Sequence, residues 1–176
     1  MKKTVLVFGL ISGGILAAVM AGTMVLYKNG RFDFDHSEVY GYTSMILAFI
    51  VVFFGVRSYR ENSGGGAITF GKAFQVGILM TLISCAMYVV TWEILYYGFV
   101  PDFADQCFAH EIAKAQASGA SAAAMAKTTA QMAHFREIYK NPLVNVGMTF
   151  LEIFPVGLVM TLISAGILRK KLTLET

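Results

Sequence analysis

Long apolar runs alternate with short polar segments along this chain of 176 residues. Four runs carry most of the apolar residues, and they lie at about 4–27, 40–59, 70–97 and 143–168. A helix needs ~20 mostly apolar residues to cross ~30 Å of hydrocarbon, so each run is long enough to span a membrane. The first run has no polar face, which a helix on the surface of a soluble domain would show. The pattern therefore predicts four membrane-spanning helices.

The segment between the third and fourth runs is polar, and it is rich in residues that favour helix. Pro101 favours a helix start, a Ser-Gly pair interrupts the segment, and Ser121 can cap a second helix. We expect an external hairpin of two helices at about 101–117 and 121–140. The apolar stripes of these helices either pack together and onto the membrane surface or dock an external partner. The predicted fold class is all-α, a single membrane domain formed by a four-helix bundle with an extracytoplasmic helical hairpin.

Composition and charge agree with a membrane location and give an orientation. The chain is 56% hydrophobic and 14% charged, whereas soluble domains have about 45–50% apolar and about 25% charged residues. The side with both termini carries eight Lys and Arg against six on the other side. Those eight lie in short segments close to the ends of the spans, where the positive-inside rule applies most strongly, so we expect cytoplasmic termini. No basic patch is interleaved with aromatic residues, so we expect no nucleic acid partner.

One apolar phrase occurs twice. FGKAFQVGILMTLIS at 70–84 and FLEIFPVGLVMTLIS at 150–164 agree at nine of fifteen positions. The two helices run in opposite directions, as in inverted-repeat transporters, so the phrase could line a substrate path. We favour a packing seam, because small residues on one helical face let membrane helices approach closely. The residues expected in this seam, including two glycines of the first span, are Gly77, Thr81, Ser84, Gly157, Thr161, Ser164, Gly9 and Gly13.

Two carboxylates interrupt the outer halves of the third and fourth spans, Glu93 and Glu152. Ionisable groups in a span are costly and usually face the bundle interior or a wet cavity. Pro155 follows Glu152 and is predicted to kink the helix. One hypothesis is that Glu152, with Glu93, Tyr88 and Trp92, lines a proton- or cation-linked cavity. The alternative is that each carboxylate bonds a nearby Tyr or Trp or reaches the outer interface.

Motifs for catalysis or cofactor binding are missing from the sequence. It has no P-loop, no GxSxG, no HExxH, and no GxGxxG between a strand and a helix. Cys107 and His110 have helical ligand spacing and His134 could approach them, but no fourth ligand is evident. We therefore expect no enzymatic activity, no cofactor and no metal site.

Three stretches carry a resemblance to a known family. They are ITFGKAFQVG at 68–77, EIFPVGLVMTLISAGILRKK at 152–171, and the second span with its GYTSMILAF and FFGVRSYR at 41–60. The chain resembles an uncharacterised four-span bacterial membrane family, filed as domain of unknown function 4199, over essentially its whole length. The resemblance implies the four-helix topology and the external helical segment, and it implies no activity.

These observations favour a non-enzymatic structural or accessory protein of the bacterial inner membrane, multi-pass and with both termini cytoplasmic. Its expected partners are the lipid bilayer and either a second copy of the chain or another membrane protein. The alternative is a small oligomeric transporter or channel subunit that uses intramembrane Glu152 and Glu93. That alternative requires oligomers, because four spans are few for a monomeric transporter.

Overall fold

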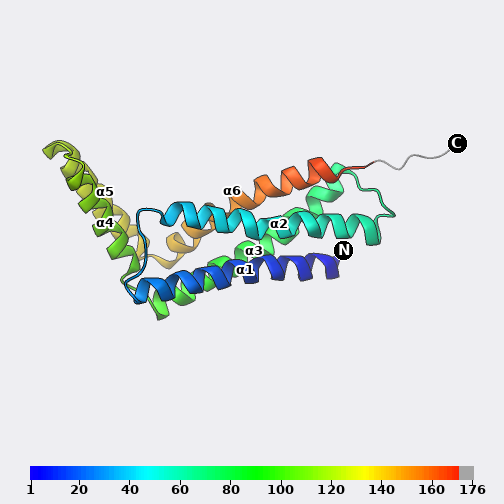
Figure 1. Cartoon of the computed structure of the whole chain (residues 1–176), viewed down its shortest axis with the longest axis horizontal. Coiled ribbons are helices and arrows are strands. Elements are labelled where there is room, and N and C mark those ends of the chain that lie inside the picture. The colour runs from blue at the N-terminus through cyan, green and yellow to red at the C-terminus, as the bar shows by residue number, and fades with distance from the viewer. Residues whose placement is uncertain (171–176) are drawn as a thin grey trace.

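The computed structural model describes residues 1–170 and is all-α in that part of the chain. Figure 1 shows the six helices, whose bounds are α1 (Lys2–Lys28), α2 (Ser37–Ser63), α3 (Phe70–Gly98), α4 (Phe103–Ala117), α5 (Ala122–Tyr139) and α6 (Pro142–Leu168). The predicted fold class is confirmed. Helices α1, α2, α3 and α6 are long and apolar enough to cross a membrane, which indicates a multi-pass membrane protein. At 1.5 Å per residue, helices of 27 to 29 residues are about 40 Å long.

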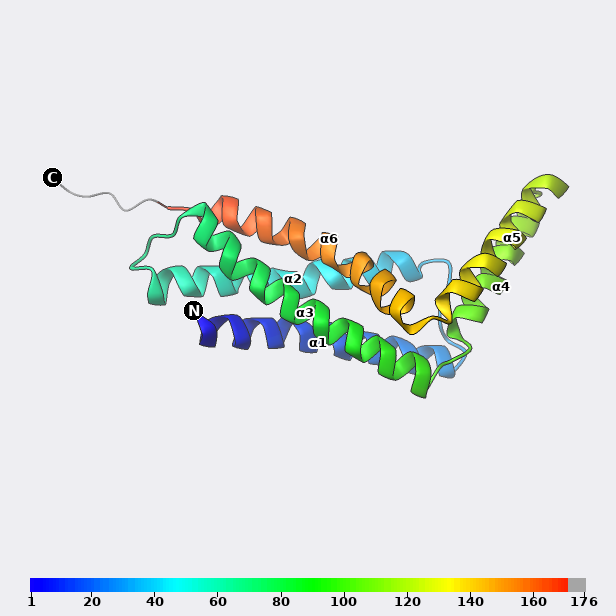
Figure 2. The ribbon, with the colours of Figure 1, turned by 180° about the vertical axis from the view of Figure 1, so that it is seen from behind.

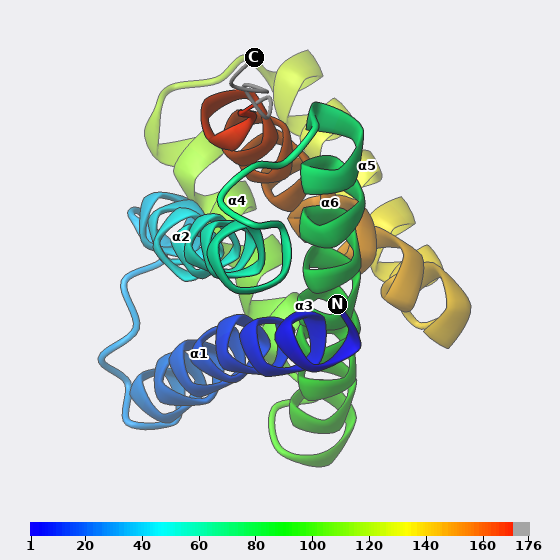
Figure 3. The same ribbon diagram turned by 90° about the vertical axis from the view of Figure 1, so that its right-hand side faces the viewer.

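The four long helices form one bundle, with the α4–α5 hairpin at one end (Figures 1 and 2). The N-terminus and the end of α6 lie at the opposite end of the bundle (Figure 1). Helix α3 packs most extensively against α1 and α6, and α2 packs against the same two helices. The view along the bundle shows this arrangement (Figure 3). An even number of crossings thus brings both ends of the described chain to one side.

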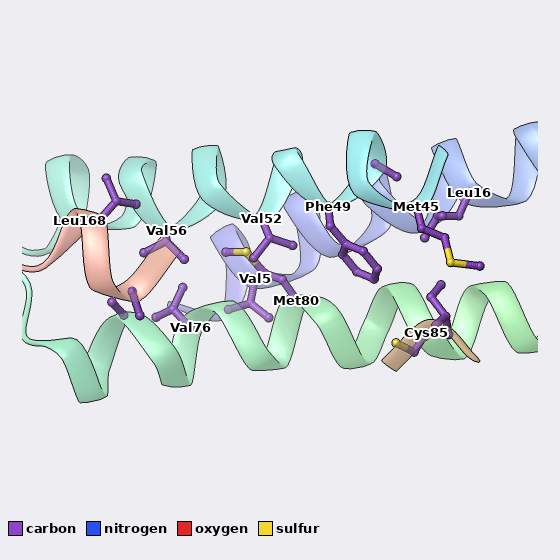
Figure 4. Packing of buried hydrophobic residues seen from close by; sticks show 14 of the residues in the cluster. Val5, Leu16, Met45, Phe49, Val52, Val56, Val76, Met80, Cys85 and Leu168 are labelled. Carbon is purple, nitrogen blue, oxygen red and sulfur yellow. The ribbon is translucent and has the colours of Figure 1, made fainter. Parts of the chain in front are cut away.

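The core of the bundle lies between α2 and α3. Met45, Phe49 and Val52 of α2 and Val76 and Met80 of α3 are almost completely buried there (Figure 4). Large apolar side chains also cover the outside of the long helices, as at positions 10, 54, 151 and 167. Helices that are apolar all round are typical of membrane spans, where lipid replaces water around the outer face.

The hairpin is less buried than the bundle. Helix α5 has no buried residue, and Ala104 is the one buried residue of α4. Ser121 caps α5 as predicted, because its side chain accepts a hydrogen bond from the backbone N–H of Ala124. Arg136 and Asp105 form an ion pair of 2.7 Å between the two helices. Helices α4 and α5 pack together, and the hairpin that they form projects obliquely from the end of the bundle (Figures 1 and 2).

Candidate functional site

The two copies of the repeated phrase cross each other where α3 packs on α6. The hydroxyls of Thr81 and Thr161 lie 2.9 Å apart, and both residues are fully buried. A methyl group added at Gly77 would lie 2.9 Å from the γ-methyl of Thr161, and one added at Gly157 would collide with the γ-methyl of Thr81. Each threonine therefore occupies the space that the glycine of the other copy leaves open. This reciprocal contact lets the two helices approach closely.

A second close approach joins α1 to α3. The Ser84 hydroxyl donates to the carbonyl oxygen of Gly9 at 3.1 Å. A methyl group at Gly9 would lie 3.0 Å from the Cβ of Ile83, and one at Gly13 would lie 2.6 Å from the Sδ of Met87. Of the eight seam residues, Ser164 alone bonds only within its own helix, to the Met160 carbonyl oxygen at 2.6 Å. The side chain of Ser164 is nevertheless almost completely buried in the bundle.

A cavity of about 800 Å³ opens at the hairpin end of the bundle. We call it the hairpin-end cavity. All six helices and residues 31–33 of the first connection contribute to its wall. It forms because α2 buries no residue before Met45, so its first two turns stand away from the bundle. Its wall reaches inward to Leu16 of α1 and Glu152 of α6. Glu152 follows the start of α6 by ten residues, a depth of about 15 Å along the helix.

The structure brings together some of the predicted site residues and separates others. Tyr88, Trp92 and Glu152 line the hairpin-end cavity, whereas Glu93 and Pro155 do not. Tyr88 and Trp92 are one turn apart on one face of α3, and the next residue is rotated by about 100° from Trp92. The expectation that Glu93 shares a cavity with Glu152 is corrected by this rotation.

Among residues 1–170, neither carboxylate makes the hydrogen bond to a Tyr or Trp that was one part of the alternative interpretation. Within residues 1–170, Glu152 makes no ion pair and no side-chain hydrogen bond, and one buried oxygen of Glu93 has no partner. Pro155 lies inside α6 and, lacking an N–H, cannot bond the carbonyl of Leu151. Figure 2 shows α6 curving along its length.

A buried polar network beside the cavity was not predicted from the sequence. The Trp92 indole N–H donates to the side-chain oxygen of Asn145 at 2.8 Å, and the Thr149 hydroxyl donates to the same oxygen at 3.3 Å. Asn145 is fully buried, and its amide nitrogen has no partner among residues 1–170. The sequence signal for this network was the asparagine at position 145, which lies within an apolar run. The amide orientation follows from the indole, which can only donate and so requires the oxygen.

Tyr139 of α5 completes the wall above this network. Burial raises the pKa of its phenol above the usual range, and the nearby Glu152 carboxylate adds to the rise. Both effects disfavour a negative charge, so the phenol is neutral and keeps its proton to donate. Tyr139 thus adds a neutral hydroxyl to the cavity wall that Glu152 also lines.

Aromatic residues fasten the first connection to the hairpin at the mouth of the cavity. Phe32 lies 5.6 Å from Phe103, and Phe34 stacks on His110 at 5.2 Å, between ring centroids. His110 also lies 3.1 Å from a carboxylate oxygen of Asp35. No group of three or more His, Cys, Asp or Glu side chains within residues 1–170 could hold a metal ion.

Comparison with known proteins gives one match. No curated protein and no solved structure matches the chain. The model of the family described as Protein of unknown function (DUF4199) matches residues 7–170, which is nearly the whole chain. The FGKAF and EIFPVG stretches both lie inside the matched range. The chain therefore belongs to the DUF4199 family, as its resemblance predicted.

Proposed function

We propose that this chain is a non-enzymatic structural or accessory protein of the bacterial inner membrane, with both termini in the cytoplasm. The observation that supports an accessory role is the α4–α5 hairpin. Helices α4 and α5 have 15 and 18 residues. Within the described chain, none of the 18 residues of α5 is buried. Most helical stability in proteins comes from packing of one face, so a hairpin with so little burial is suited to packing on a partner. That partner is a second copy of the chain or another membrane protein.

The inner half of the bundle supports a role without transport. Below the hairpin-end cavity, Met45, Phe49, Met80 and Thr81 are buried and fill the space between α2, α3 and α6. The hydroxyl of Thr81 is bonded to Thr161 rather than free to meet a solute. The cavity therefore has access from one side of this layer only.

Affinity purification of the full chain from native membranes tests the accessory role. Two differently tagged copies are expressed together at native level, cross-linked and solubilised in mild detergent. We expect recovery of the second tag or of one defined membrane protein. A variant with residues 112–133 replaced by a short Gly-Ser turn keeps the ion pair of Arg136 with Asp105 and should lose that partner. Recovery of the intact chain alone, as a monomer, would contradict the proposal.

The cavity itself favours a second candidate function, a small oligomeric transporter or channel subunit that uses Glu152. The specific observation is that this unpaired carboxylate can be reached through the hairpin-end cavity. Flux of protons and of cationic solutes into vesicles should be measured for the wild type and for Glu152→Gln. Transport requires flux in the wild type that the variant lacks, and absence of flux in both excludes this function.

A further inference from the structure

The charges that line the hairpin-end cavity are unbalanced. Among the described residues, three carboxylates face one guanidinium, and these four side chains are Asp33, Glu38, Glu152 and Arg31. Asp33 is held by His36 at 2.8 Å. Glu152 lies deepest and makes no ion pair. A cleft lined by one sign of charge raises the local concentration of ions of the other sign.

The rest of the wall around Glu152 is aromatic and aliphatic. The aromatic residues Trp92 and Tyr88 of α3 and Phe103 of α4 line the cavity, and so do the flexible Met20 and Met24 of α1. Aromatic faces attract cations, and quaternary ammonium groups are held in this way in aromatic cages. Methionine side chains adapt to irregular apolar shapes.

We propose that the hairpin-end cavity binds a hydrophobic organic cation, with its charge beside Glu152 and its apolar body against Trp92 and the methionines of α1. The volume of about 800 Å³ lies within the roughly 300–1,000 Å³ of small-molecule sites. A carboxylate without a partner in an apolar wall is costly, and an arriving cation removes that cost. This inference goes beyond the accessory role, because residues 112–133 of the hairpin do not line the cavity.

Other ligand classes fit this wall less well. An anion would meet three carboxylates and one guanidinium. A metal ion would need several ligands, and residues 1–170 bring no group of three acidic, His or Cys side chains together. A neutral apolar molecule would leave the Glu152 carboxylate without a partner. The combination of an unpaired carboxylate within a membrane span and a large apolar wall selects a cation that is itself mostly apolar.

Binding can be measured with tetraphenylphosphonium, because Trp92 is the single tryptophan of the chain and lines the cavity. The full-length protein in phosphatidylcholine nanodiscs is titrated while Trp92 fluorescence is recorded, with empty nanodiscs as the partition control. Tetraphenylborate has the same shape and the opposite charge. Glu93→Gln is the matched variant, since it removes a carboxylate one residue from Trp92 that does not line the cavity.

We expect saturable fluorescence change with the phosphonium and none with the borate. Glu152→Gln should weaken binding at least tenfold, and Glu93→Gln should leave the affinity unchanged. Equal binding by wild type and Glu152→Gln, equal binding of the two probe ions, or no saturation in the wild type would each overturn the proposal. If Glu152→Gln is not monodisperse, Thr23→Phe serves in its place, because it narrows the cavity and keeps the carboxylate; unchanged affinity in that variant overturns the site.

Discussion

Replacing Gly157 by alanine should destabilise the crossing of α3 and α6. The added methyl group would lie 2.7 Å from the Phe49 ring and would collide with the γ-methyl of Thr81. Normal contacts between carbon atoms are about 3.5–4.0 Å, and both neighbours are fully buried and cannot turn away. Overpacking of this kind costs about 1–3 kcal/mol. The better helix propensity of alanine returns about 1 kcal/mol, so we expect a net loss of up to about 2 kcal/mol relative to the wild type.

Gly147→Ala is the matched control on the same helix. A methyl group there meets nothing within 4 Å, so we expect unchanged or slightly higher stability. Combining Gly157→Ala with Thr81→Ser should recover part of the loss, because serine keeps the hydroxyl and removes the colliding methyl group.

The free energy of unfolding is measured in mixed micelles, in which the mole fraction of a denaturing detergent is increased stepwise. Trp92 fluorescence reports it at the interface concerned, since the indole of α3 bonds to Asn145 of α6. If Gly157→Ala were as stable as Gly147→Ala, the close approach of the two helices would be wrong. If Thr81→Ser brought no recovery, the collision would not be with the Thr81 methyl group.

Three further predictions concern the network, the hairpin and the orientation. Asn145→Ala removes the acceptor of the buried Trp92 N–H, which should cost about 1–3 kcal/mol of unfolding free energy and shift the Trp92 emission; an unchanged spectrum would contradict the bond. Burial raises the pKa of Cys107 to about 11, so its thiolate is scarce at pH 8, and its alkylation rate should rise about tenfold per pH unit up to pH 10; a pH-independent rate would refute this. A reporter fused at Gly65 should show the activity of a cytoplasmic location, and one fused at Gly119 should show the activity of an external location. The reverse result would mean that the proposed orientation is inverted.

The number and bounds of the helices follow from local patterns. A run of apolar residues long enough to span the bilayer has one stable backbone, because unbonded N–H and C=O groups are too costly in lipid. The four predicted spans match α1, α2, α3 and α6 to within a few residues. The hairpin was predictable for a similar reason, since Ser121 and the Ser-Gly interruption act on their immediate neighbours.

The partners of single side chains depend on how the helices tilt and rotate. Glu93 and Glu152 look alike in the sequence, as carboxylates in outer half-spans. Only Glu152 lines the cavity, because the Tyr88–Trp92 face of α3 turns toward it and Glu93 turns away. Asn145 could not be predicted as the partner of Trp92, since the two are 53 residues apart.

The sequence by itself determined the fold class, the four spans, the hairpin and the small residues available for close packing. These are properties of neighbouring residues and of their hydrophobicity. The tertiary structure decided that Gly77 and Gly157 each receive the threonine of the other copy. It also decided that the first turns of α2 stand apart and leave a cavity against Glu152. Both depend on the relative placement of distant helices, which apolar patterns with no polar face leave undetermined.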